Sequence, residues 1–170
     1  MGSVVQDSEL FRIPGRALSN IDLLYLAKKL GVHNFLGVFM RDEIAKITEK
    51  NKSKKSQSFI FNIQTSREPG VHWVLFAKSP NFGVIFFDSY GQVPCGELRE
   101  YLGENVEIQR NIYTVQSDFS SECGRLCLFV LQALSLNIPF DKIIQTLRRR
   151  YDGRRERTTG ENSEEESGEK

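Results

Sequence analysis

The sequence predicts an α+β fold in which helices at both ends of the chain flank a mostly antiparallel central sheet. Three observations support this prediction. An amphipathic helical pattern occupies the first part of the chain, strand-length apolar runs lie in the middle, and a long apolar helical pattern follows them. The runs at 71–77 and 82–88 are separated only by KSPN, which is typical of two antiparallel strands joined by a hairpin.

The first predicted element is a helix over residues 21–30. Ser19 or Asn20 can cap its first turn, and Asp22 favours the positive end of the helix dipole. Gly31 can close the helix. The elements that follow are a polar connector over 51–58, a strand over 59–64, a turn at Pro69-Gly70, a short helix over 97–103 and a strand within 106–116.

Two further helices are predicted towards the C-terminus. Residues 123–137 are apolar nearly all round, which indicates a buried helix. Pro139 then starts an amphipathic helix over 140–149.

The C-terminal stretch has a different composition. Residues 148–157 carry six Arg against two acids. Residues 158–170 carry five Glu against one Lys and contain no Val, Ile, Leu, Met, Ala or aromatic residue. Such a segment cannot bury apolar surface, so 148–170 is predicted to be a charged, disordered tail after a single domain over 1–147.

Composition excludes several classes of protein. A net charge of +1 argues neither for nor against a nucleic-acid partner. No apolar run approaches the ~18 residues of a membrane span, so no membrane partner is predicted. Three cysteines cannot all pair, and together with the absence of a signal-peptide pattern they predict an intracellular, reducing compartment. Two histidines and three scattered cysteines make a tetrahedral zinc site hard to build, so neither a metal nor another cofactor is predicted.

Four polar side chains are candidates for one chemistry. Cys123 begins the apolar helix, where the helix dipole lowers the pKa of a thiol. His72 is a candidate base, and Asp88, at the end of the next strand, can orient its imidazole. Gln116 can donate a hydrogen bond to a developing oxyanion. Taken singly, each residue also has a plainer interpretation: a buried structural cysteine, a packed strand histidine, a turn-initiating aspartate and a polar residue at a strand end.

Other residues of the same types fit the plainer interpretation. Cys127 lies one turn further into the apolar helix, where a small buried side chain is expected. His33 follows the end of the first helix and is assigned no chemistry. Gly124, beside Cys123, permits close approach of another part of the chain.

The order and context of the four candidates form a specific set. His72 and Trp73 lie on one predicted strand, and Asp88 ends the next. Gln116 then precedes Cys123-Gly124 with six residues between, and Cys123 begins the apolar helix. Residues 19–137 resemble the adenain family of adenovirus cysteine proteases. The resemblance is carried by the segments LAKKLGVHNFLGVF, VHWVLFA, FFDSYG and QSDFSSECGRLCLFVLQAL. The wider clan includes the SUMO- and ubiquitin-like-protein proteases. Those usually have one residue fewer between the Gln and the Cys, so the spacing here favours the adenain branch.

The resemblance implies a papain-like cysteine endopeptidase. By motif, Cys123 is the nucleophile, His72 the base and later the acid, Asp88 the residue that orients His72, and Gln116 the oxyanion donor. The implied substrates are viral precursor or capsid proteins, cleaved near small residues such as Gly. The implied location is the virion and the host nucleus.

The chain also departs from the adenain pattern. The cysteine that links adenain to its activating peptide lies a little before the oxyanion Gln, and the corresponding stretch here, 103–116, contains no cysteine. Cys95 does not align with it. A disulfide-linked activating peptide is therefore not expected.

Two alternatives and one partner stay open at this point. The same four residues would serve an isopeptidase that removes ubiquitin-like modifiers, or the fold could persist in a non-catalytic binding protein. The arginine block at 148–157 either contacts DNA phosphates without sequence preference or is a solvated helix end whose arginines favour the negative end of the dipole.

Overall fold

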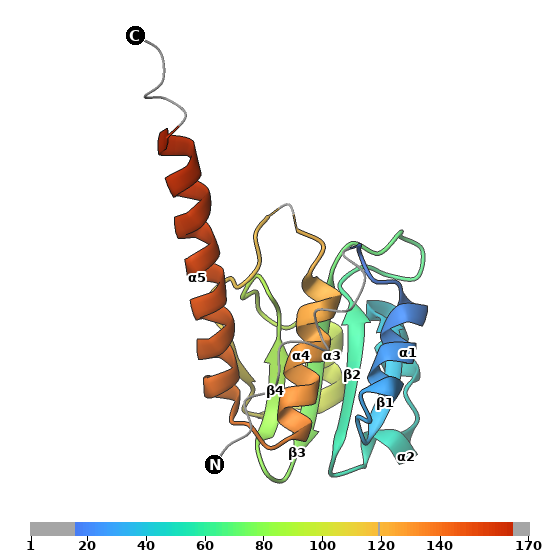
Figure 1. The fold of residues 1–170 in the computed structure, drawn as a ribbon. Coiled ribbons are helices and arrows are strands. Elements are labelled where there is room, and N and C mark those ends of the chain that lie inside the picture. The colour runs from blue at the N-terminus through green and yellow to red at the C-terminus, as the bar shows by residue number, and fades with distance from the viewer. Residues whose placement is uncertain (1–15, 119, 165–170) are drawn as a thin grey trace.

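The protein forms a five-stranded sheet with helices on both faces (Figure 1). The computed structural model describes residues 16–118 and 120–164. In chain order, the elements are α1 (Asn20–Lys29), β1 (Phe35–Met40), the 3-10 helix η2 (Arg41–Lys46), α2 (Glu49–Lys52), β2 (Gln57–Asn62), β3 (Trp73–Ser79), β4 (Gly83–Phe87), α3 (Gly96–Leu102), β5 (Gln109–Arg110), α4 (Cys123–Ser135) and α5 (Phe140–Glu164).

The strands lie in the sheet in sequence order, and the predicted α+β class is confirmed. The hairpin of β3 and β4 is antiparallel as expected, and β2 is antiparallel to β3. The two edge strands differ from the prediction, because β1 is parallel to β2 and β5 is parallel to β4. The connections through η2 with α2 and through α3 return the chain in its original direction, so the sheet is mixed.

Each face of the sheet has its own apolar core. On one face α1, α4 and α5 pack on the sheet around Leu23, Leu75 and Leu128. On the other, η2 and α3 cover a cluster that includes Phe59 and Phe76. Because α4 lies across the middle of the first face, its N-terminus meets the end of the sheet where β3 begins (Figure 1).

The local signals read at the first helix are confirmed. The side chain of Ser19 accepts a hydrogen bond from the Asp22 N–H at 3.2 Å, and the Asp22 carboxylate accepts one from the Ser19 N–H at 2.8 Å. Gly31 follows the helix with a φ of 67°, in the left-handed region that favours glycine.

Several elements differ from the sequence prediction. Neither β1 nor η2 was predicted, and the predicted polar connector overlaps the end of α2 and the start of β2. The strand predicted within 106–116 is reduced to Gln109–Arg110. The remainder of that stretch instead bonds to the turn after β4, where the Val115 N–H donates to the Ser89 carbonyl at 2.7 Å.

The predicted disorder of 148–170 is wrong for residues 148–164, which continue α5 as a helix. Arginine is a good helix former, and the side chains of this block find partners on the body of the protein. The Arg148 guanidinium lies 4.0 Å from the Tyr113 ring centroid, and Arg154 pairs with Glu122. Residues 165–170 lie outside the described part, and the predicted boundary after residue 147 stays a prediction.

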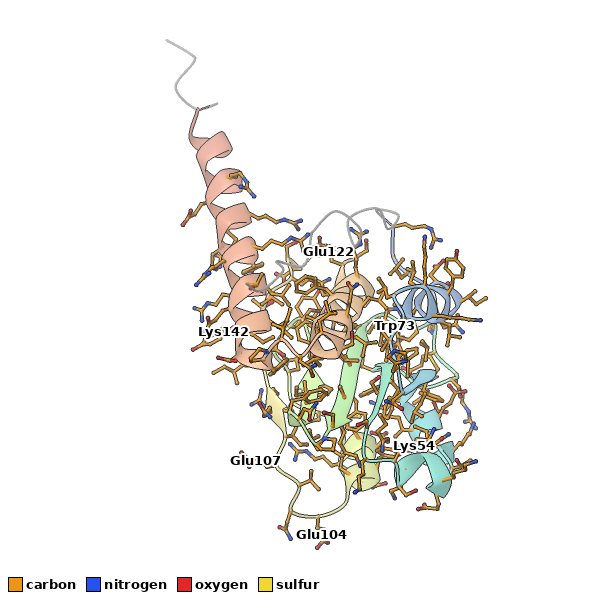
Figure 2. All side chains as sticks on the ribbon, turned by 60° about the horizontal axis from the view of Figure 1, so that its bottom comes forward. Lys54, Trp73, Glu104, Glu107, Glu122 and Lys142 are labelled. Carbon is orange, nitrogen blue, oxygen red and sulfur yellow. The ribbon has the colours of Figure 1, made fainter. Side chains whose placement is uncertain are left out.

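The loop after α3, residues 103–107, lies at a different end of the molecule from the contact of Arg154 with Glu122. Figure 2 shows Glu104 and Glu107 at the end of the body opposite Glu122. Residues 103–107 of this loop are all exposed. Among the described residues, no helix is both long and apolar enough to cross a membrane.

Candidate active site

His72 and Asp88 meet at one end of the sheet. Leu75 pairs with Phe87 across the antiparallel strands, so His72, just before β3, and Asp88, just after β4, come to the same end of the sheet. His72 Nε2 is 2.8 Å from Asp88 Oδ1, and both side chains are buried. The predicted pairing of these two residues is therefore present in the structure.

Cys123 is the first residue of α4 and lies against His72. Its side chain is buried and hydrogen-bonds with the imidazole. Because Asp88 engages Nε2, the ring nitrogen left for the sulfur is Nδ1. The backbone N–H groups of Trp73 and Gly124 add further hydrogen bonds to the sulfur.

The electrostatics of the Cys123–His72 pair favour the charged form of both groups. Burial opposes charge on His72, but the hydrogen bond to Asp88 and the contact with Cys123 outweigh it and raise the pKa of His72 to about 9. Burial likewise raises the pKa of Cys123, but the hydrogen bond from His72 and the backbone donors leave it below its ordinary value. The arrangement therefore supports a thiolate beside an imidazolium.

Gln116 lies in the same pocket and is held at both ends of its amide. The Ser89 hydroxyl donates to Gln116 Oε1 at 2.7 Å, and Gln116 Nε2 donates to the Ser120 carbonyl at 2.6 Å. These bonds fix the orientation of the amide and leave one hydrogen on Nε2. A group bound beside Cys123 can accept that hydrogen.

Asp88 also begins a turn, as its plainer interpretation predicts. Its Oδ1 accepts the Tyr90 N–H at 2.8 Å, and its carbonyl accepts the Gly91 N–H at 2.8 Å. Asn111 clamps the same residue, since its side chain bonds both the N–H and the carbonyl of Asp88. The turn therefore sets the direction of the carboxylate towards His72.

Sequence reasoning missed several residues that support this site. The Tyr90 ring stacks on His72, with centroids 4.9 Å apart and an interplanar angle of 38°. Ser89 orients Gln116, and Asn111 holds Asp88. Ser89 and Tyr90 are in the D-S-Y-G turn and could have been found there. Asn111 carried no signal, because it lies in a stretch predicted as strand.

Three of the candidate residues, His72, Gln116 and Cys123, line a cavity of about 520 Å³. One wall is formed by 17–20 and another by 68–71. Trp73 ties the first wall to the sheet, because its Nε1 donates to the Leu18 carbonyl at 2.8 Å. A Cβ on Gly124 would lie 3.2 Å from Leu23 and 3.3 Å from Trp73, so the predicted close approach at this glycine is present.

The other two cysteines have different surroundings. Cys127 is fully buried in α4, and burial raises the pKa of its thiol well above the ordinary value. Cys95 precedes α3, and burial raises the pKa of its thiol as well. Within 16–118 and 120–164, no group of His, Cys, Asp and Glu side chains has the arrangement of a metal site.

Comparison with solved structures places this arrangement within a known fold class. No family model matches the sequence, and neither does any curated protein. The structure is similar to the ASFV pS273R protease, with a TM-score of 0.53 and 14% identity over 82% of this chain and 68% of that one. It is also similar to the SUMO protease Ulp1 with an oxidised catalytic cysteine, with a TM-score of 0.51 and 15% identity over 80% of this chain and 76% of that one.

The chain thus shares its fold with these two proteases, and the papain-like α+β fold that the sequence resemblance predicted is confirmed. At these identities the likeness is one of fold. Membership of the ubiquitin-like-protein protease clan, and of its adenain branch, stays a prediction. The roles of His72, Asp88, Gln116 and Cys123 rest on their geometry.

Proposed function

We propose that the protein is a cysteine protease whose catalytic residues are Cys123, His72, Asp88 and Gln116. The observation that carries the proposal is the buried Cys123–His72–Asp88 arrangement, in which Cys123 and His72 line a cavity. Burial alone would keep both Cys123 and His72 neutral, yet the pKa of the thiol is lowered and that of the imidazole is raised. A structural cysteine needs no such partner, as Cys127 illustrates.

The reaction follows from this geometry. The Cys123 thiolate attacks the scissile carbonyl carbon, and the resulting oxyanion accepts hydrogen bonds from the Cys123 N–H and from Gln116 Nε2. His72 gives its proton to the leaving nitrogen as the C–N bond breaks, which leaves a thioester and an amine. Water then attacks the thioester while His72 takes its proton. Release of the carboxylic acid product restores the thiolate and the imidazolium.

The test uses purified protein and a quenched fluorogenic peptide containing Gly-Gly. We expect hydrolysis by the wild type and none by folded Cys123→Ala, with His72→Ala nearly as impaired. A peptide carrying a thiol-reactive group should label Cys123. A folded Cys123→Ala variant with wild-type turnover would exclude the proposal. Failure of the wild type to react with either reagent would favour a non-catalytic binding protein.

An isopeptidase acting on a ubiquitin-like modifier is the second candidate. It is favoured by the similarity in fold to the SUMO protease Ulp1. The same assay run with ubiquitin- and SUMO-based fluorogenic substrates separates the two activities. A preference for the modifier over the short peptide by 100-fold or more in kcat/KM would assign the isopeptidase.

Viral precursor or capsid proteins are the proposed natural substrates, processed in the virion or the host nucleus. The motif resemblance to adenain supports this, together with the similarity in fold to a viral protease. Incubating the protein with structural proteins encoded beside its gene, and sequencing the new termini, tests the proposal. Cuts after small residues such as Gly are expected, and intact substrates would contradict it.

DNA is a proposed further partner, bound through exposed arginines of α5 such as Arg149, Arg155 and Arg157. The binding would be electrostatic and independent of sequence, so it should weaken steeply with salt. Charge reversal of these three residues should abolish retention on duplex DNA. Binding that ignores salt or survives charge reversal would contradict the proposal.

A further inference from the structure

Glu122, the residue directly before Cys123, is clamped by two arginines of α5. Arg154 donates to both carboxylate oxygens of Glu122, at 2.9 and 3.0 Å, and Arg150 donates to Oε1 at 3.2 Å. The Glu122 side chain is only 16% exposed. Figure 2 shows Glu122 at the start of α4, and Figure 1 shows α5 running past that end of the helix. This contact joins the C-terminal helix to the residue beside the sulfur.

The clamped residue ends the segment that builds the oxyanion site. Residues 117–122 connect Gln116 to Cys123, the two donors that face the scissile carbonyl. One anchor of this segment is the Ser120 carbonyl, which accepts the Gln116 amide. A second is the Glu122 carbonyl, which accepts the Leu126 N–H at 2.9 Å and begins α4. The third anchor is the Glu122 carboxylate, which binds the two arginines. The Glu122 side chain does not cap α4, so no helix-capping bond competes with this contact.

The same contact has an electrostatic effect. An uncompensated carboxylate one residue from Cys123 would oppose ionisation of the thiol. Burial raises the pKa of Glu122, but the hydrogen bond from Arg154 and the nearby arginine charges leave it below its ordinary value, so Glu122 is ionised and neutralised in place. The other charged or titratable groups around Glu122 and Cys123 are His72, Asp88, Tyr90, Asp118, Arg125, Cys127 and Arg155.

We propose that Glu122, held by Arg150 and Arg154, is a positioning residue for the candidate reaction. The clamp holds Glu122 in place beside Ser120, so that the Cys123 N–H and the Gln116 amide keep their places, and it keeps the Glu122 charge from opposing the thiolate. The inference rests on the proposed protease function. The plainer alternative is an ion pair that only fastens α5 to α4. That alternative predicts a loss of stability without any change in the chemistry.

The main test compares the double variant Arg150→Ala/Arg154→Ala with the wild type in the full chain. Misplaced donors should lower kcat by roughly 10–100-fold while KM stays within about twofold. The Glu122 carboxylate without its two arginine partners should also move the acid limb of the kcat/KM profile upward, by about 0.5–1 pH unit. Arg148→Ala is the matched control, because Arg148 lies on the same helix but contacts Tyr113 and Asp152.

Two further variants separate position from charge. Adding Glu122→Gln to the double variant should return the acid limb to its wild-type pH while kcat stays low. Arg154→Lys in the otherwise wild-type chain keeps the charge and should keep the acid limb in place. If the double variant does not fold, Arg154→Gln and Glu122→Gln singly provide the same two readouts.

Alkylation of Cys123 by iodoacetamide, followed against pH by mass spectrometry, keeps this inference distinct from the proposed function. The double variant should show its thiolate at higher pH than the wild type even if no peptide is hydrolysed. Wild-type kcat and an unmoved acid limb in a folded double variant would overturn the inference. A rise in KM alone would also overturn it, since it would make the arginines substrate contacts.

Discussion

Replacing Asp88 by Asn removes a charge from the site and keeps the shape of the side chain. The pKa of His72 is raised from its ordinary 6.5 to about 9, which corresponds to about 3 kcal/mol in favour of the charged ring. Burial opposes this shift, so the Asp88 and Cys123 interactions together supply more than that amount. The Asp88 hydrogen bond is the largest of the favourable contributions. We therefore expect Asp88→Asn to lower the pKa of His72 by roughly 1–2 units.

The sign of the pH effect follows from which state is active. The ion pair exists above the pKa of Cys123 and is lost as pH rises through the pKa of His72, about 9 in the wild type. A lower pKa of His72 moves the alkaline limb of the kcat/KM profile towards neutral pH. At pH 8.5 this should cost roughly tenfold in activity, less than removal of His72 itself.

The assay records kcat/KM on one peptide between pH 5 and 10.5, after circular dichroism confirms folding. Asp118→Asn is the control, since Asp118 is an exposed carboxylate of the same region without a bond to His72. An alkaline limb that stays near pH 9 in Asp88→Asn would refute the reasoning. A limb that moves equally in both variants would refute it too.

Three other outcomes are expected. One equivalent of iodoacetamide at pH 7 should label Cys123 before Cys95 and Cys127, because burial raises the pKa of the other two thiols. Peptide mass spectrometry measures the labelling, and equal labelling of the three cysteines would contradict the lowered pKa of Cys123. Gln116→Ala should lose roughly 10²–10³ in kcat with KM nearly unchanged in steady-state assays, and a raised KM alone would make Gln116 a ground-state contact. Gly91→Ala should lower the free energy of unfolding in urea by about 2–4 kcal/mol, since its φ is 71° and an added Cβ would lie 2.9 Å from backbone; unchanged stability would show that the turn can shift.

The fold was predictable where local signals agree with tertiary packing. The cap at Ser19, the β3–β4 hairpin and the apolar helix after Cys123 each follow from a short pattern. The parallel edge strands do not, because pairing direction depends on how η2, α2 and α3 route the chain. The helix over 148–164 was not predicted, because composition shows only that this stretch has few apolar side chains to bury. It does not show that its arginines contact Glu122 and Tyr113.

The candidate site shows the same division. His72, Asp88, Gln116 and Cys123 could be named from the sequence because their order along the chain is distinctive. Their mutual distances could not, since these depend on strand register and on the placement of α4. The supporting contacts of Asn111 and Glu122 were beyond sequence reasoning, because each joins segments that lie far apart in the chain.

The exposed loop at 103–107 is a site for inserting a label far from the cavity. Gly103 has a φ of 84°, and a Cβ there would meet nothing within 4 Å. Figure 2 places Glu104 and Glu107 at the end opposite Glu122. Loop tips of this kind tolerate inserted sequence. A fluorescent reporter or an affinity tag spliced between Glu104 and Asn105 would leave both the cavity and α5 untouched, so that binding of a candidate substrate could be followed on the intact protein.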